Sequence, residues 1–442
     1  MKKEYLIQEK PLKALLIFAF PMIIGNLFQQ FYTMVDSIVV GRFVSENALA
    51  AIGASYSLTT VFISIAIGGG VGASVITSRY FGAREYRNMK LSIRTALLSF
   101  LILSFLLGTF GQIFSKKIMA ALNTPENILD QAAEYLTIYF LGLPFLFMYN
   151  ILSAMFNALG RSKIPLFLLI FSSIFNILLD IFMVKNLHMG VAGVAWATLI
   201  AQGISAIFAF LLFLKEMSHY PSKESYGWFS TMEFSNMAQI ALPSILQQST
   251  VSIGMMLVQS VVNSFGSEML AGFSAAMRIE SICVVPMAAM GNVLSSYTAQ
   301  NIGAGQYNRV KKGYYTGYGI VAFFALLLCL WLEIFYMPLI QMFLGEDGTV
   351  LAIQTGTGYL RFMGWFFILI GLKMITDGVL RGSGDMKMFT IANLVNLGIR
   401  VVVAFLFAPI YGISMVWIAV PIGWLANYLI SFAEYKTGKW KA

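Results

Sequence analysis

Charged residues are scarce in this 442-residue chain. They make up 11% of it, whereas hydrophobic residues make up 58%. A soluble domain carries about 25% charged residues, because polar side chains must cover much of its surface. The composition therefore argues against a soluble globular protein and indicates that lipid is the solvent. A spanning helix needs roughly 20 apolar residues, which leaves room for about a dozen spans.

Cysteine and histidine are nearly absent, with two residues of each. Cys283 and Cys329 lie inside apolar runs, which argues against a disulfide framework. His188 and His219 show no metal-ligand spacing, and no Walker A loop or nucleophile elbow is present. Metal-dependent catalysis, nucleotide hydrolysis and nucleophilic catalysis by a hydrolase are each marked by such a motif. We therefore expect neither an enzyme nor a bound organic cofactor.

Long apolar stretches are abundant, and their pattern predicts twelve membrane-spanning helices. The first stretch is too long for the hydrophobic part of a signal peptide, so we expect a retained first helix. The twelve predicted spans are residues 14–40, 47–78, 91–115, 129–158, 164–186, 190–214, 237–262, 269–300, 314–344, 351–379, 388–409 and 412–434.

Basic residues are distributed unevenly between the predicted loops. With the N-terminus placed in the cytoplasm, the inside segments hold 21 of the 29 Lys and Arg residues and the outside segments hold four. By the positive-inside rule, this asymmetry predicts a multi-pass protein of the plasma or inner membrane with both termini in the cytoplasm. It also accounts for the net charge of +9 without a nucleic-acid partner.

The two halves of the chain repeat each other. Matching positions lie 220–222 residues apart: Pro21 and Pro243, Gly82 and Gly303, Asn176 and Asn396. Each half holds six predicted helices, an even number, so the halves share one orientation and are related by an axis along the membrane normal. We predict an all-α integral membrane fold of two six-helix lobes: an N-lobe at 1–215, a cytoplasmic linker at 216–236 and a C-lobe at 237–442.

Three segments carry a family resemblance: residues 36–53 (with Val39-Val40-Gly41-Arg42), residues 300–306 (QNIGAGQ) and residues 380–385 (LRGSGD). Together the chain resembles the multidrug and toxic compound extrusion (MATE) family over nearly its whole length. The resemblance implies two lobes around a V-shaped central cleft, and antiport of small-molecule organic cations against H+ or Na+ by a monomer. The seventh predicted helix has Gln247-Gln248 and no acid, so the chain is more similar to the DinF-like and MepA-like branches than to the NorM-like branch.

Acidic residues within the predicted spans are the first candidates for ion coupling. A carboxylate in a span costs roughly 2.5–3.5 kcal/mol on insertion scales, so such residues are usually functional. Asn176 and Asp180 are four residues apart and share a helix face. The resemblance implies that Asp36, Asn176, Asp180 and Thr198 form a polar cluster that binds H+ or Na+. The alternatives are a capping role for Asp36 and ordinary interhelical hydrogen bonds for Asn176 and Thr198.

Other polar residues are candidates for lining the substrate cleft: Gln30, Gln248, Glu280 and Arg400. The glutamines can equally bridge helices, and Glu280 is a candidate for a second cation site. Lys373 and Asp377 are four apart, which favours a structural salt bridge. Pro21 removes a backbone hydrogen bond and can kink its helix. The kink is either static or coupled to protonation.

Two transport functions remain open on the sequence. The first is a secondary exporter of organic cations that works by alternating access. The second is a flippase for a lipid-linked saccharide or another amphipathic lipid, which would favour a cationic cavity. The matching points Asn176-x-x-x-Asp180 and Asn396-x-x-x-Arg400 differ in charge, which places the predicted ion coupling in the N-lobe. The coupling ion, the substrate and the stoichiometry stay open.

Overall fold

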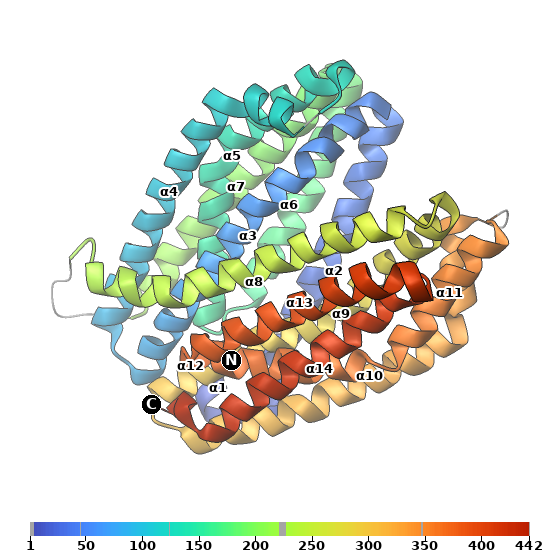
Figure 1. Ribbon diagram of the computed structural model, residues 1–442. Coiled ribbons are helices and arrows are strands. Elements are labelled where there is room, and N and C mark those ends of the chain that lie inside the picture. Colours follow the sequence, from blue (N-terminus) through green and yellow to red (C-terminus); the bar gives the residue numbers. More distant parts are fainter. Residues whose placement is uncertain (1–3, 45, 123, 221–226, 346–347, 442) are drawn as a thin grey trace. The chain divides into compact units, whose positions relative to one another are not determined.

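The computed structural model describes residues 4–441, apart from residues 45, 123, 221–226 and 346–347. At residues 35–43, 46, 47, 49 and 57 it describes the backbone but not the side chains. Every element in the described part of the chain is a helix, and no strand occurs there (Figure 1). The predicted all-α fold is confirmed.

The helices are long and apolar enough to cross a membrane. Eleven of them pass as single spans within the described residues, and one bent pair makes a twelfth. Twelve spans were predicted from the apolar stretches, and this number is confirmed when the bent pair is taken as one span. The chain is therefore a multi-pass membrane protein.

The chain folds into two compact units that do not follow the sequence halves. Unit 1 comprises residues 1–23 and 246–442, and unit 2 comprises residues 24–245. Each boundary falls inside a helix, two residues after its proline, at Pro21 and at Pro243. The lobe boundaries at 215 and 237 describe the sequence repeat, and they stay a prediction.

Unit 2 is built around one central helix, α5 (Glu126–Ala158). It packs against α3 (Glu46–Ala83), α4 (Tyr86–Ala121) and α7 (Gly190–Met217) (Figure 1). A Cβ at Gly111 would lie 2.2 Å from the ring of Phe140, so only glycine lets α4 approach α5 this closely. The other helical segments of unit 2 are the C-terminal part of α2 (Pro11–Phe43), α6 (Lys163–Ile181), the π-helical turn η1 (Phe182–Asn186) and the N-terminal part of α8 (Thr231–Asn263).

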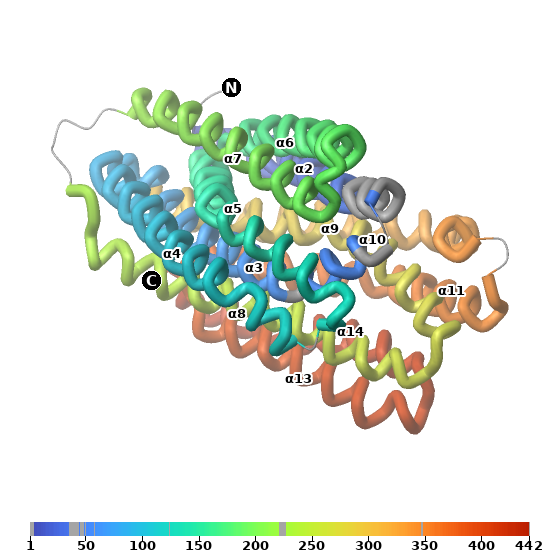
Figure 2. The backbone as a smooth tube through the Cα atoms, turned by 90° about the horizontal axis from the view of Figure 1, so that it is seen from above, coloured from blue at the N-terminus to red at the C-terminus, as the bar shows by residue number. Residues whose placement is uncertain are grey.

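Unit 1 has α9 (Ser267–Gly303) at its centre. This helix packs against α10 (Tyr307–Leu344), α11 (Val350–Gly364) and α12 (Phe367–Ser383). A Cβ at Gly378 of α12 would lie 2.4 Å from the carbonyl oxygen of Gly291 in α9, so these two backbones are in direct contact. The helices α13 (Met386–Tyr411) and α14 (Ser414–Thr437) lie side by side (Figure 2). The short elements are α1 (Tyr5–Gln8) and η2 (Lys439–Lys441).

The N-terminal segment belongs to unit 1. The guanidinium of Arg309 in α10 donates from Nη2 to the carbonyl oxygens of Leu6, at 3.0 Å, and Glu9, at 2.7 Å. Asn301 Nδ2 also donates to the Leu6 carbonyl, at 3.2 Å. These bonds satisfy carbonyl groups at the end of α1 that have no partner within the helix.

The prediction of one continuous helix over residues 351–379 is wrong. The chain breaks between α11 and α12, and the two helices meet at 53°. No proline lies in this stretch, whereas α5 runs on through Pro144 without a break. At the end of α11, Trp365 Nε1 donates to Glu333 Oε1 of α10 at 3.0 Å, and Arg361 Nε donates to Glu333 Oε2 at 3.2 Å. These contacts with α10 hold the last turn of α11 at the point where the helix ends.

Candidate functional site

Three helices of unit 2 bring polar side chains together around Asn176. Asn176 lies on α6 and is buried, with 2% of its surface exposed. Its amide contacts the hydroxyl of Tyr32 on α2 at 2.6 Å and Thr198 Oγ1 on α7 at 3.3 Å. Polar contacts between helices are costly to break in lipid. The amide therefore joins α2, α6 and α7.

Asp180 completes this group one turn further along α6. Its side chain is fully buried, and its Oδ2 lies 3.1 Å from the amide of Asn176. In the orientation that satisfies both ends of the amide, Asn176 Nδ2 donates to Asp180 Oδ2 and to Tyr32 Oη, and Oδ1 accepts from the Thr198 N–H at 3.1 Å. Which end is nitrogen is assigned from these partners. The structure thus brings Asn176, Asp180 and Thr198 together.

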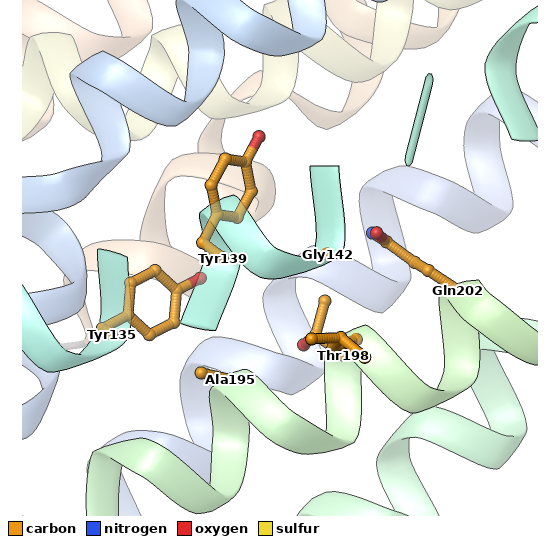
Figure 3. A pocket seen from close by; sticks show the side chains of 7 residues that line it. Tyr135, Tyr139, Gly142, Ala195, Thr198 and Gln202 are labelled. Carbon is orange, nitrogen blue, oxygen red and sulfur yellow. The ribbon is translucent and has the colours of Figure 1, made fainter. Parts of the chain in front are cut away.

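Thr198 also lines a small pocket (Figure 3). Tyr135 and Tyr139 project into it from α5, and Thr198 and Gln202 line it from α7. The pocket has room for about one water molecule, far less than a site for a small organic ligand requires. Thr198 therefore belongs both to the Asn176 group and to the lining of this small pocket.

Three residues of α2 were predicted to take part in transport, namely Asp36, Gln30 and Pro21. The side chain of Asp36 lies outside the described residues, so its place in the cluster stays a prediction. Gln30 is exposed, and Pro21 lies inside the helix without ending it. Tyr32 was not predicted from the sequence. It precedes Asp36 by four residues in the sequence, and this i, i+4 spacing was the available signal.

Unit 1 holds a second buried carboxylate, Glu280 of α9. The hydroxyl of Tyr359 on α11 donates to Glu280 Oε2 and also contacts Met277 Sδ at 3.2 Å. Arg400 of α13 lies close enough to interact electrostatically with Glu280 and Tyr359. Glu280 and Arg400, two of the proposed cleft residues, therefore belong to one group in the structure. Gln248 is partly buried on α8.

The predicted salt bridge between Lys373 and Asp377 is confirmed. Lys373 Nζ lies 3.2 Å from Asp377 Oδ2, and both side chains are about 4% exposed. Asp377 also accepts from Ser431 Oγ at 2.8 Å and from Asn393 Nδ2 at 3.3 Å. A buried ion pair requires such additional hydrogen bonds to offset the loss of water. Lys373 is thus neutralised within unit 1.

Comparison with known proteins identifies the family. A family model described as MatE matches residues 21–182 and 243–406. The probable multidrug resistance protein YpnP of Bacillus subtilis is 29% identical over 444 residues, which cover 100% of this chain and 98% of that protein. The FAD transporter of Shewanella oneidensis is 25% identical, with 96% of this chain and 93% of that protein covered. The multidrug export protein MepA of Staphylococcus aureus is 22% identical, with 94% and 92% covered.

Solved structures show the same fold. A MATE crystal structure in the bent conformation has a TM-score of 0.90 and 24% identity, and it covers 99% of this chain and 97% of its own. An outward-facing multidrug resistance MATE transporter has a TM-score of 0.89 and 23% identity, with 99% and 98% covered. The family match spans equivalent stretches of both repeat halves and well over half of the sequence. The chain therefore belongs to the MatE family of multidrug efflux transporters, and it is a membrane transporter rather than an enzyme.

Proposed function

We propose that this chain is a secondary antiporter that exports organic cations in exchange for H+ or Na+ by alternating access. The observation that carries the proposal is the buried carboxylate of Asp180 beside the Asn176 amide. An acid at this depth is costly in lipid and usually marks an ion pathway. The names of YpnP and MepA, which describe multidrug resistance and multidrug export, support the same assignment.

The Asn176 amide gives Asp180 a hydrogen-bond partner in both protonation states. An ionised Asp180 accepts from Asn176 Nδ2. In the reversed orientation of the amide, Oδ1 faces Asp180 and accepts from Tyr32, while Nδ2 donates to Thr198 Oγ1. Oδ1 can then accept a hydrogen bond from the O–H of a protonated Asp180, whereas an ionised carboxylate would repel this oxygen. Loading and release of a proton are therefore coupled to the rotation of one amide.

Sodium is the second candidate for the coupling ion, at Asp36, Asn176, Asp180 and Thr198. Carboxylate, amide and hydroxyl oxygens suit a hard cation. However, the Asn176 amide already donates to Asp180 Oδ2, and its oxygen accepts from the Thr198 N–H. A site built for Na+ would direct several oxygens at a common point. We therefore propose H+ as the coupling ion and Na+ as the alternative to be tested.

The energetics allow such an exchange. Moving one charge through 100 mV supplies about 2.3 kcal/mol. A tenfold concentration gradient costs about 1.4 kcal/mol. One proton moving inward can therefore sustain a useful outward gradient of a small organic cation.

We further propose a monomer in the plasma membrane with both termini in the cytoplasm. The excess of Lys and Arg in the predicted inside loops supports this orientation. Cysteines placed at Lys10 and Lys436 should react with an impermeant maleimide only after cells are opened, whereas a cysteine at Lys116 should react in intact cells. The reverse labelling pattern would overturn the proposed orientation.

A flippase for a lipid-linked saccharide or another amphipathic lipid is the second candidate function. Its cationic cavity would have to be built from residues such as Arg278 and Arg400. Lys373 contributes little to it, because its ammonium pairs with Asp377. The similarity to an FAD transporter keeps an anionic amphipathic substrate as a specific alternative.

Purified protein in lipid vesicles tests the assignment. The fluorescent cation ethidium is followed under an imposed proton gradient, then under an imposed sodium gradient. We expect transport with the proton gradient, and we expect Asp180→Asn to abolish it while insertion into the membrane is unchanged. Asp130→Asn is the matched control, because Asp130 is 84% exposed and pairs with Lys116.

Each outcome of this experiment decides a point. Transport at the wild-type rate by the Asp180→Asn variant would overturn the coupling role of Asp180. Transport driven only by the sodium gradient would replace H+ by Na+. If the wild-type protein does not transport ethidium but moves a labelled anionic lipid between the two leaflets, the flippase is favoured.

A further inference from the structure

The side chain of Asn427 on α14 is a fully buried amide that forms no hydrogen bond with the described residues. Its side chain is 0% exposed, and neither Nδ2 nor Oδ1 has a hydrogen-bond partner among the described residues. Buried polar groups in proteins are nearly always hydrogen-bonded. An amide with both ends unpartnered is therefore a strong sign that it binds something.

Two more unpartnered groups come from the neighbouring helix α13. Asn396 is 8% exposed, and its Oδ1 has no hydrogen-bond partner in the described part of the chain. The Nε of Arg400 is buried and also finds no partner there. A Cβ at Gly423 of α14 would lie 2.3 Å from Asn396 Oδ1 and 3.2 Å from Arg400 Cγ, so both side chains reach the surface of α14 at this glycine.

Gly423 and Asn427 are four residues apart, so they lie on the same face of α14. The packing of α13 against α14 therefore places Asn396, Arg400 and Asn427 along one stretch of the same interface. Together they offer two unused donor groups, Arg400 Nε–H and Asn427 Nδ2, and two unused acceptors, Asn396 Oδ1 and Asn427 Oδ1. The set is mixed in polarity and lies inside unit 1.

The combination of two donors and two acceptors determines which kind of ligand can bind here. A metal cation would be repelled by the guanidinium of Arg400. An anion could accept from the two donors but could not donate to the two amide oxygens, which would stay unsatisfied. A small neutral molecule that both donates and accepts satisfies all of these groups, and internal water typically makes about three such bonds. We propose that unit 1 contains an internal water-binding site between α13 and α14, held by Asn396, Arg400 and Asn427.

The site lies beside the buried ion pair. Asn427 is four residues before Ser431, which donates to Asp377, and Asn396 is three residues after Asn393, which donates to the same carboxylate. At its other end, Arg400 interacts electrostatically with Glu280. Water at this place would connect the Lys373–Asp377 pair with Glu280 through hydrogen-bonding groups, and unit 1 would then have a hydrated polar interior.

The sign of one stability change tests the proposal. Leucine has nearly the shape of asparagine but lacks both amide atoms. If Asn427 binds water, Asn427→Leu removes its hydrogen bonds to that water and leaves Asn396 and Arg400 without a bridging partner. The apparent Tm in detergent should then fall by about 2–4 °C, for a destabilisation near that of one hydrogen bond. If the site is dry, the same change removes two unsatisfied groups and Tm should rise. A rise would overturn the proposal.

Two control variants calibrate the change in apparent Tm. Asn393→Leu removes an amide that bonds to Asp377 and to the Phe389 carbonyl, so its Tm should fall whatever occupies the site. Gly398→Ala on α13 adds a methyl group that meets no atom within 4 Å and changes no polar group, so its Tm should stay or rise.

A structure at a resolution that shows waters gives the direct readout. We expect density within hydrogen-bond distance of at least two of Asn396, Arg400 and Asn427 in the wild-type protein, and its loss in Asn427→Leu. Apolar packing throughout this interface, with no such density while other internal waters are visible, would also overturn the proposal. Neither result depends on whether Asp180 couples transport to protons.

Discussion

At the scale of single residues, the Asn176 amide is the contact on which the candidate site depends. It touches Tyr32, Asp180 and Thr198 from three helices. Because an amide has a donor end and an acceptor end, it can serve the charged and the neutral form of one carboxyl group. The two hydroxyl neighbours of Asn176, on Tyr32 and Thr198, should therefore affect the transport rate without being essential to transport.

Tyr32→Phe should slow proton-driven ethidium transport by about two- to tenfold, which corresponds to one hydrogen bond of about 0.5–1.5 kcal/mol. The variant keeps the aromatic ring and loses only the hydroxyl that contacts Asn176 at 2.6 Å. Initial rates in vesicles provide the measurement. Tyr56→Phe, at a side chain that is 62% exposed, should leave the rate unchanged. Equal rates for both variants would exclude Tyr32 from the site.

Asp385 is an acid whose surroundings favour its neutral form. It lies between α12 and α13, outside the spans, and burial together with the negative charge of Glu434 raises the pKa of its carboxyl group, against the opposing charge of Lys439. Its side chain makes no capping bond to α13. A raised carboxyl pKa contributes stability below the unfolded pKa, and this contribution is lost as the pH rises through the folded pKa.

Asp385→Asn should therefore raise the apparent Tm at pH 7, where the native carboxylate is penalised, and change it little near pH 4. Thermal unfolding of both proteins in detergent at the two pH values gives the comparison. A lower Tm at pH 7, or the same shift at both pH values, would contradict the assigned role of burial and of Glu434.

At the scale of helices, close backbone contacts determine how unit 1 packs. The carbonyl of Gly291 occupies the space that a side chain at Gly378 would need. Small residues that let helices approach are the main device of helix packing in membranes. The α9–α12 pair should therefore tolerate no side chain at this point.

Gly378→Ala should lower the yield of folded protein and the apparent Tm, because overpacking costs about 1–3 kcal/mol. Gly398→Ala is the matched control, since a Cβ at that helical position meets no atom within 4 Å. It should be neutral or slightly stabilising, because alanine is the better helix former. Similar Tm values for the two variants would refute a backbone contact between α9 and α12.

The sequence predicted helices better than the contacts between them. The apolar stretches were long and clearly bounded, so the spans were predictable. The break between α11 and α12 was not, because no proline marks it in the sequence, and the contacts with Glu333 of α10 at this point join residues 28 or more apart. Likewise, the i, i+4 spacing brought Asn176 and Asp180 to one face, but the contact with Tyr32 spans 144 residues of sequence.

In the C-terminal half, the Lys373–Asp377 pair was predictable because both partners lie on one helix. The group of Asn396, Arg400 and Asn427 could not be predicted, because the register of α13 on α14 brings it together. That register depends on packing, for which the sequence contains no local signal.

At the scale of the whole molecule, unit 1 is discontinuous in sequence. Its first 23 residues are joined to residues 246–442, and Arg309 binds the carbonyls of Leu6 and Glu9. This anchoring means that the N-terminal segment should be ordered only when α10 is in place.

Arg309→Gln should speed amide hydrogen exchange in residues 5–10 and leave exchange in unit 2 unchanged, because both carbonyl bonds are lost. Mass-spectrometric exchange measurements on detergent-solubilised protein can resolve this segment. Lys311→Gln, at an exposed position on the same helix, serves as the control. Unchanged exchange in residues 5–10 of the Arg309 variant would show that the anchor lies elsewhere.

The same discontinuity has a consequence for biosynthesis. Domains generally fold as units while the ribosome is still adding residues, and unit 2 is a single run of sequence that ends at residue 245. The carbonyl of Leu6, in contrast, can form its hydrogen bond only after Arg309 has been synthesised, 303 residues later. Leu6 and its neighbours are thus made early and reach their final contacts late, and a nascent chain that stops before α10 would expose them to proteases.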